Sequence, residues 1–105
     1  MKVVITEFAK QQIREIAQSI QRSFGKKHRE NFMQKVKETR LLLADNPHLG
    51  HEEPLLTDSP KGYRSIVVTK LNKMVYYVDN NTTIFIVDFW DVRREPSTLA
   101  NQVKD

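Results

Sequence analysis

The stretch that decides the fold runs from Tyr63 to Asp91 and reads YRSIVVTKLNKMVYYVDNNTTIFIVDFWD. Three segments within it are rich in the β-branched and aromatic residues typical of β-strands: Tyr63–Thr69, Met74–Asp79 and Thr83–Asp91. The polar breaks between them, residues 70–73 and 80–82, are short enough for hairpins. The pattern therefore predicts a three-stranded meander. Its third segment is apolar almost throughout, as expected of a central strand covered on both faces.

The residues before this stretch predict two helices. Thr6 is a good N-cap and Glu7 suits a first helical turn. Apolar residues at spacings of three and four then continue to Gly25, which supplies the stop. Residues 26–45 predict a second helix, which ends at residue 46 because the position before a proline avoids the α region. A single glycine between two helices predicts an antiparallel hairpin.

The remaining segments complete the expected architecture. Residues 2–5, KVVI, predict a first strand at the sheet edge opposite its neighbours in sequence. Residues 47–60 hold three prolines and predict a loop, and residues 97–103 predict a short helix capped by Ser97. The order β-α-α-β-β-β is an α+β pattern. We expect an α-helical hairpin packed on a small antiparallel β-sheet.

The composition limits the classes of protein to consider. The length of 105 residues predicts a single domain, residues 1–105. The absence of cysteine excludes disulfides, thiolate nucleophiles and cysteine metal sites. The first residues lack the apolar core of a signal peptide, and no apolar run is long enough to span a membrane, so we expect a cytoplasmic protein. The net charge of +4 fits a nucleic-acid or acidic protein partner, although many ordinary proteins carry as much.

Standard catalytic and metal-binding signatures are missing. The chain has no GxSxG, P-loop or HExxH motif. His28, His48 and His51 are scattered, and the last two share a loop with Glu52 and Glu53. A metal site needs more ligands at fixed geometry, so solvated loop residues explain this group better. We therefore expect no metal and no cofactor.

Two carboxylates interrupt the last predicted strand. Asp88 and Asp91 lie three positions apart, so they point to opposite faces of the sheet. They do not form a general acid/base pair by local geometry. A solvent-facing or salt-bridged role is the better prediction for both.

The candidate site consists of cations at the ends of the predicted strands: Arg64, Lys73, Arg93 and Arg94. Strand periodicity alone does not force these residues to converge. Patterning alone favours surface cations that protect strand edges from aggregation. A second basic set lies on the predicted helices, where a solvated helix face is the better explanation: Arg22, Lys26, Lys27, His28, Arg29, Lys35, Lys37 and Arg40.

The predicted elements contain specific sequence motifs in a fixed order. A first strand, a hairpin ending in L…NPHLG, and then YRSIVV, KMVYYV, TIFIVDFW and RREP resemble the RelE/ParE toxin superfamily. The resemblance covers the chain from Val3 to about Leu99. It implies a compact α+β domain that acts as the toxin of a type II toxin–antitoxin module. It also implies neutralisation by a tightly bound antitoxin.

The family divides by mechanism. RelE-like members are ribosome-dependent endoribonucleases that cut mRNA, whereas ParE-like members poison DNA gyrase. The resemblance places Arg64, Lys73 and either Arg93 or Arg94 at positions where the RNase branch has cations. One lysine of the RelE pattern falls at Ile66, and the tail after Arg94 has no tyrosine or histidine. The most characteristic acid/base residue of the RNase branch is therefore absent.

The absence of this acid/base residue bears on whether the chain could cleave RNA. Cleavage through the 2′-hydroxyl needs a base, an acid and stabilisation of the charged phosphorane. Arginines supply the stabilisation but are poor acids, because they remain protonated. Three interpretations stay open: a metal-independent endoribonuclease acting on ribosome-bound mRNA, a gyrase inhibitor without a catalytic site, and a degenerate protein that only binds its antitoxin. The remaining cations slightly favour the endoribonuclease.

The expected partner in every case is an antitoxin. The resemblance implies a short acidic protein, encoded next to this gene. It would lay a helix or a strand across apolar surface of the hairpin and sheet. Phe24, Leu49 and Trp90 are candidate contacts for it.

Overall fold

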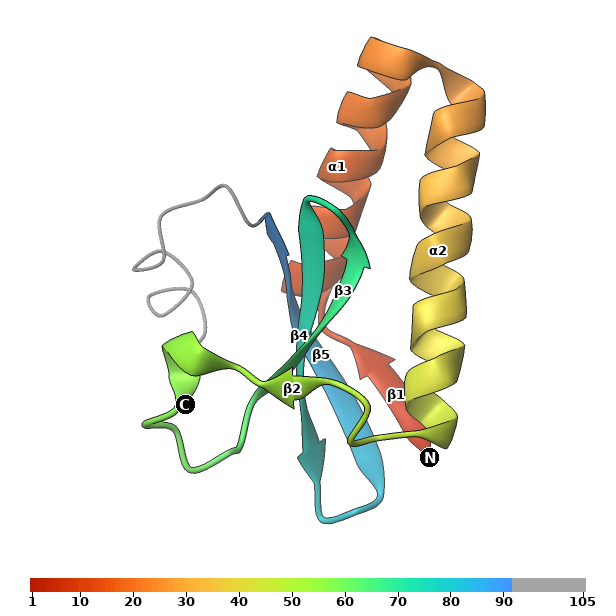
Figure 1. Ribbon diagram of the computed structural model, residues 1–105. Coiled ribbons are helices and arrows are strands. Elements are labelled where there is room, and N and C mark those ends of the chain that lie inside the picture. The colour runs from red at the N-terminus through yellow and green to blue at the C-terminus, as the bar shows by residue number, and fades with distance from the viewer. Residues whose placement is uncertain (92–105) are drawn as a thin grey trace.

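The computed structural model describes residues 1–91 of the chain (Figure 1). Its elements are, in chain order, β1 (Lys2–Ile5), α1 (Glu7–Phe24), α2 (Lys26–Asp45), β2 (His51–Glu52), the 3₁₀ turn η1 (Pro54–Leu56), β3 (Arg64–Thr69), β4 (Asn72–Asp79) and β5 (Thr83–Asp91). Arg93, Arg94 and the helix predicted at residues 97–103 with its Ser97 cap lie outside the described residues.

The two helices have the predicted bounds, and hydrogen bonds at the two ends of α1 explain where it begins and ends. The Thr6 hydroxyl accepts a hydrogen bond from the Ala9 amide at 3.2 Å, which caps α1. Gly25 adopts φ +97° and its amide donates to the Gln21 carbonyl at 2.9 Å, so the chain turns directly into α2. Among the residues that the structure describes, no helix has the length and apolar character to cross a membrane.

The sheet has the order β1-β5-β4-β3-β2, which confirms that the first strand joins the far edge. β1 runs parallel to β5, so the sheet is mixed rather than purely antiparallel as expected. The helical hairpin explains the direction, because it returns the chain to the end at which β1 starts. There the Met1 ammonium donates to the Ala44 carbonyl at 3.0 Å. The three-stranded meander then leaves β5 running the same way as β1.

Three segments differ from the prediction, the smallest difference being that β3 begins at Arg64, one residue later than predicted. The segment 47–60 is not a plain loop, because β2 pairs with the start of β3 and η1 follows it. β4 begins at Asn72, two residues earlier than predicted. Asn72 pairs with Thr69, and the Thr69 hydroxyl donates to Asn72 Oδ1 at 2.9 Å. This side-chain bond tightens the turn to residues 70 and 71.

Apolar side chains cover both faces of β5, as its sequence predicts. On one face the hairpin packs on the sheet, with Phe32 of α2 meeting Phe89 of β5 edge to face at 5.7 Å. On the other face a smaller cluster joins Leu56 and Tyr63 to Val75 and Trp90. The segment after β2 therefore lies on the sheet face opposite to the helices (Figure 1).

Candidate functional site

The candidate cations do not converge in the described part of the chain. Arg64 pairs with Tyr76 across β3 and β4, whereas Lys73 pairs with Val67. Residues three apart on a strand point to opposite faces. Tyr76 belongs to the core under the helices, so Arg64 lies on the helical face and Lys73 lies on the other. The remaining two candidates, Arg93 and Arg94, lie outside the described residues.

Arg64 anchors residues 47–50, the segment that leads from α2 into β2. Its Nη1 donates to the Gly50 carbonyl at 2.7 Å. The Gly50 amide in turn donates to the Tyr76 hydroxyl at 2.9 Å, and that hydroxyl donates to the Pro47 carbonyl at 2.9 Å. The three side-chain bonds tie residues 47–50 to β3 and β4. In this arrangement Arg64 positions backbone, and one of its donors is already used.

Tyr76 is the centre of that network and was not singled out by the sequence. Its side chain is fully buried, and burial raises the pKa of the Tyr76 hydroxyl above its ordinary value of 10.0. The hydrogen bond from the Gly50 amide and the charge of Arg64 lower the same pKa to a smaller extent. The neutral phenol is therefore the form that the fold favours.

Replacing Tyr76 with phenylalanine is expected to lower the free energy of unfolding by about 1–3 kcal/mol, because the buried Gly50 amide loses its acceptor.

The stability that Tyr76 contributes is expected to decrease at alkaline pH. A raised folded-state pKa means that the contribution of Tyr76 is fully present below pH 10 and is lost as the pH rises further. Urea unfolding from pH 8 to 11 should therefore show the wild-type chain approaching Tyr76→Phe at the alkaline end. A constant difference across that range would contradict this account.

Lys73 is held by a carboxylate that the sequence analysis had placed in a solvated loop. Its Nζ donates to Glu53 Oε2 at 2.7 Å. Glu53 is 0% exposed, and the Lys73 side chain is 18% exposed. Solvated loop placement is therefore wrong for Glu53. The signal in the sequence was its position directly before Pro54, where a carboxylate caps a short helical turn.

The Glu53 carboxylate also fixes the backbone around it. Its Oε1 accepts from the Leu55 amide at 3.3 Å, at the start of η1. The Glu53 amide donates to the Tyr63 carbonyl at 2.9 Å. Lys73 thus completes a clamp that holds the segment 53–63 against the sheet. The ion pair at 2.7 Å therefore gives the Lys73 ammonium a partner inside the fold.

Asp88 lies on the same sheet face as Lys73. It pairs with Val75 on β4, next to a bulge that shifts the register between β4 and β5. Asp88 is fully buried, so a solvent-facing role is wrong for it. Asp91, three residues later, lines a groove on the helical face, which confirms that the two carboxylates diverge.

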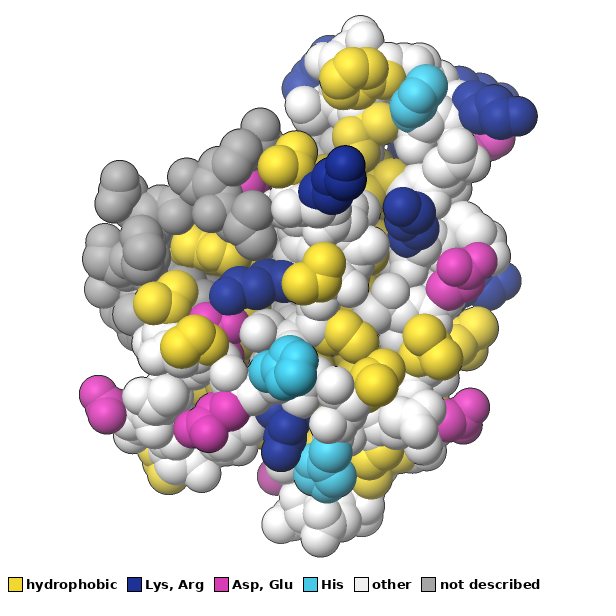
Figure 2. Space-filling view, in the orientation of Figure 1, with side chains coloured by type: hydrophobic (Ala, Val, Ile, Leu, Met, Phe, Trp, Pro, Cys, Tyr) yellow, Lys and Arg dark blue, Asp and Glu magenta, His cyan; other side chains and the backbone are white. Residues whose placement is uncertain are grey.

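On the surface formed by β2 and β3 the cations are likewise not gathered at one site. Figure 2 shows Lys and Arg side chains at separate places on this face, with hydrophobic and histidine side chains between them. They gather more closely around the tip of the helical hairpin. Within residues 1–91, no group of three or more His, Asp or Glu side chains is arranged to hold a metal ion.

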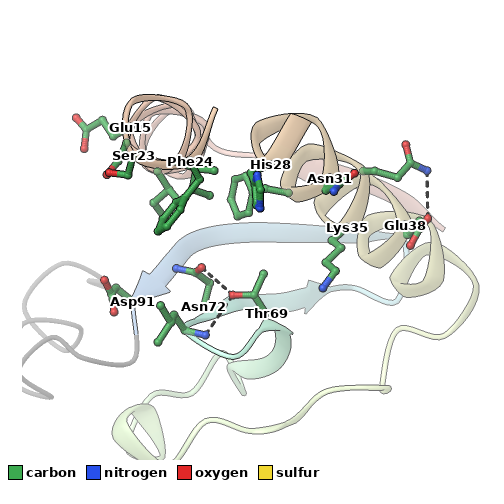
Figure 3. A pocket seen from close by; sticks show the side chains of 16 residues that line it. Glu15, Ser23, Phe24, His28, Asn31, Lys35, Glu38, Thr69, Asn72 and Asp91 are labelled. Carbon is green, nitrogen blue, oxygen red and sulfur yellow. Dashed lines mark hydrogen bonds between the residues drawn. The ribbon is translucent and has the colours of Figure 1, made fainter. Parts of the chain in front are cut away.

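Two hollows flank the helical hairpin. The first, of about 1020 Å³, lies between the hairpin tip and the β3–β4 turn, where Phe24 and His28 face Thr69 and Asn72 (Figure 3). Its charged lining is mixed, with Lys35 among acidic residues. The second, of about 870 Å³, runs between α1 and α2 and is lined by six cations and one carboxylate. The second hollow is the one with a defined chemical character.

Known structures share this architecture. A chain of the chromosomal ParDE TA system from P. aeruginosa matches with a TM-score of 0.71 at 16% identity, covering 87% of this chain and 95% of that chain. The YoeB/ParE toxin from Agrobacterium tumefaciens matches with a TM-score of 0.58 at 20% identity, covering 87% and 98%. At such identities the likeness shows the fold. No curated protein sequence matches the chain.

The sequence itself supplies the family. Residues 3–96 match the model for the ParE toxin of the type II toxin–antitoxin system parDE. Together with the fold, this match defines a toxin of a type II toxin–antitoxin system. The chain belongs to the ParE toxin family. A cognate antitoxin is the partner that this membership implies.

Proposed function

We propose that the chain acts as a ParE-type inhibitor of DNA gyrase, which works by binding and has no RNA-cleaving centre. The observation that carries the proposal is the use of Lys73. Its ammonium is matched by the buried Glu53, so it has a structural partner where the RNase interpretation needs a free cation.

The placement of Arg64 supports the same proposal. An RNase centre needs its charge-stabilising groups around one phosphate. Arg64 and Lys73 lie on opposite faces of the sheet, and Arg64 already donates to the Gly50 carbonyl. On these grounds the proposal ranks the gyrase inhibitor above the endoribonuclease, which the sequence slightly favoured. An inhibitor that works by binding needs complementary surface rather than an acid and a base.

Induced expression in bacteria tests this proposal against the endoribonuclease. We expect growth arrest with an induced DNA-damage response, and mRNA that stays intact when mapped by primer extension. Arg64→Ala, measured at a temperature at which it remains folded, should keep the DNA-damage response. Cleavage of mRNA at ribosome-occupied codons, abolished by Arg64→Ala, would overturn the proposal in favour of the RNase. An inert protein would instead favour the degenerate antitoxin-binding module.

A further inference from the structure

The turn that joins α1 to α2, residues 21–29, is named here the hairpin tip. It projects beyond the sheet (Figure 1), and every residue from 21 to 28 is exposed. No Asp or Glu lies within it, and Glu30 follows it directly. It carries four cations, one at the end of α1 and three at the start of α2: Arg22, Lys26, Lys27 and Arg29. The sequence analysis had assigned them to a solvated helix face.

The tip cations contribute little to the stability of the fold. Within residues 1–91 the ion pairs are those of Lys10 and Lys73, so no tip cation has a carboxylate partner. Arg29 donates to Gln21 Oε1 at 2.7 Å, which joins the two helices. The first turn of α2 has neither an acidic residue nor a side-chain cap, and the positive end of its dipole disfavours cations there. An anion at the tip would therefore relieve the repulsion among these charges.

An exposed aromatic side chain lies among the cations. Phe24 is 67% exposed, whereas Trp90, another antitoxin contact suggested by the sequence, is 3% exposed. The Phe24 ring lies 5.8 Å from the ring of His28, and both line the hollow beside the β3–β4 turn (Figure 3). Figure 2 shows hydrophobic and histidine side chains between Lys and Arg side chains at the tip. Cations around an apolar wedge are the means by which many proteins hold a DNA groove.

The composition of the tip selects among anionic partners. Phe24 is the one apolar side chain within residues 21–29, so a protein partner would bury little there. The cores of protein interfaces are also depleted of lysine. Phosphates, by contrast, are contacted by exposed Lys and Arg side chains without any apolar floor.

The width of the tip suits a duplex. Packed helices lie about 8–10 Å apart, close to the roughly 12 Å width of the major groove of DNA. We propose that the hairpin tip binds duplex DNA, with its cations on the phosphates and Phe24 in the groove. This proposal deepens the proposed function and rests on it for its setting, because gyrase holds the DNA that the tip would contact.

A pair of charge-removal variants tests the proposal. Arg22→Gln/Lys27→Gln removes two tip cations that line neither hollow. Lys2→Gln/Lys37→Gln makes the same change at exposed positions away from the tip. Binding of a labelled duplex of about 20 base pairs is followed by fluorescence anisotropy from about 0.05 to 0.2 M NaCl, with melting curves to show that each variant is folded. We expect the dissociation constant to rise at least about tenfold for the tip variant and less than about threefold for the control. The salt slope should fall by about 2 for the tip variant alone.

The exposed ring has its own test. Phe24→Ala should weaken DNA binding about fivefold or more and leave the salt slope unchanged, because it removes an apolar contact and no charge. Phe8→Ala is the matched control, since Phe8 is 43% exposed in the first turn of α1, at the opposite end of that helix. Equal effects of the two substitutions would contradict the role of Phe24.

The possible outcomes are separable. Absence of DNA binding by the wild-type chain would overturn the proposal, and so would equal weakening by the tip variant and its control. A duplex RNA of the same sequence that binds at least as tightly would overturn the assignment to DNA. Weaker binding of the tip variant to gyrase without DNA, with full DNA binding, would assign the tip to the enzyme's protein surface and overturn the proposal.

Supercoiling by purified gyrase separates this proposal from the proposed function. If the wild-type chain blocks gyrase and the tip variant binds DNA as the wild type does, the tip proposal fails and the proposed function stands. If the wild-type chain leaves gyrase active while the tip variant loses DNA binding, the proposed function fails and the DNA-binding site stands.

Discussion

Replacing Lys73 with methionine is expected to lower the free energy of unfolding by about 3–5 kcal/mol. The change leaves the fully buried carboxylate of Glu53 without the ammonium that now lies 2.7 Å from it. A domain of this size has a total stability of about 5–15 kcal/mol, so the loss would be a large share of it. Urea unfolding followed by the fluorescence of Trp90 gives the measurement.

A double variant distinguishes the effect of removing the whole Lys73–Glu53 ion pair from the effect of removing Lys73 alone. Lys73→Met/Glu53→Gln removes both charges and keeps an oxygen that accepts from the Leu55 amide. It should recover most of the lost stability, because a buried pair replaced as a whole costs little. Lys70→Met, on the exposed β3–β4 turn, serves as the matched control and should stay within about 0.5 kcal/mol of wild type. A Lys73→Met chain as stable as this control would contradict the buried pair.

The same double variant also bears on mechanism. If Lys73 only holds the segment 53–63 in place, restoring stability should restore toxicity. An endoribonuclease that uses the Lys73 ammonium would stay inactive however stable the fold became. Toxicity is therefore measured beside stability for both the single and the double variant.

Substituting alanine for Gly50 is expected to lower the free energy of unfolding by about 2–4 kcal/mol. An added Cβ would lie 2.6 Å from the Ser65 carbonyl oxygen and 2.8 Å from the Tyr76 hydroxyl. The first of these is backbone of a paired strand, so the segment 47–50 must move. That movement strains the bonds of Gly50 to Tyr76 and to Arg64.

A second glycine provides the control for this prediction. Gly62 adopts φ +68° and has nothing within 4 Å of an added Cβ. Gly62→Ala should therefore show only the backbone cost of that conformation, about 1 kcal/mol. Chemical unfolding of both variants gives the comparison. Equal losses for the two would show that the contact at Gly50 is not the cause.

Local patterns were sufficient to predict most of the fold. Thr6 and Gly25 fixed the ends of the first helix, and the change to β-rich composition after residue 62 located the meander. The direction of β1 was missed, because it depends on where the helical hairpin returns the chain. The two-residue strand β2 was missed as well, since pairing of that length leaves no periodicity to read.

The candidate site was harder to predict, because its geometry also depends on contacts between residues that are distant in the sequence. Alternation along a strand gives a face only when the register with its neighbour is known, and the register came from the structure. The partner of Lys73 lies 20 positions away, in a segment that resembles a solvated loop. The Tyr76 network likewise spans 26 and 29 positions. Such long-range polar pairs leave no local signal in one sequence.

Inhibition of gyrase by the purified chain is the most direct test of the account. Relaxed plasmid, gyrase and ATP are incubated with increasing amounts of wild-type toxin and of Lys73→Met/Glu53→Gln, and the topoisomers are resolved on a gel. The account predicts that both chains block supercoiling, and that added antitoxin restores it. Unimpaired supercoiling at toxin in excess over gyrase, together with cleavage of ribosome-bound mRNA by the same preparation, would contradict it.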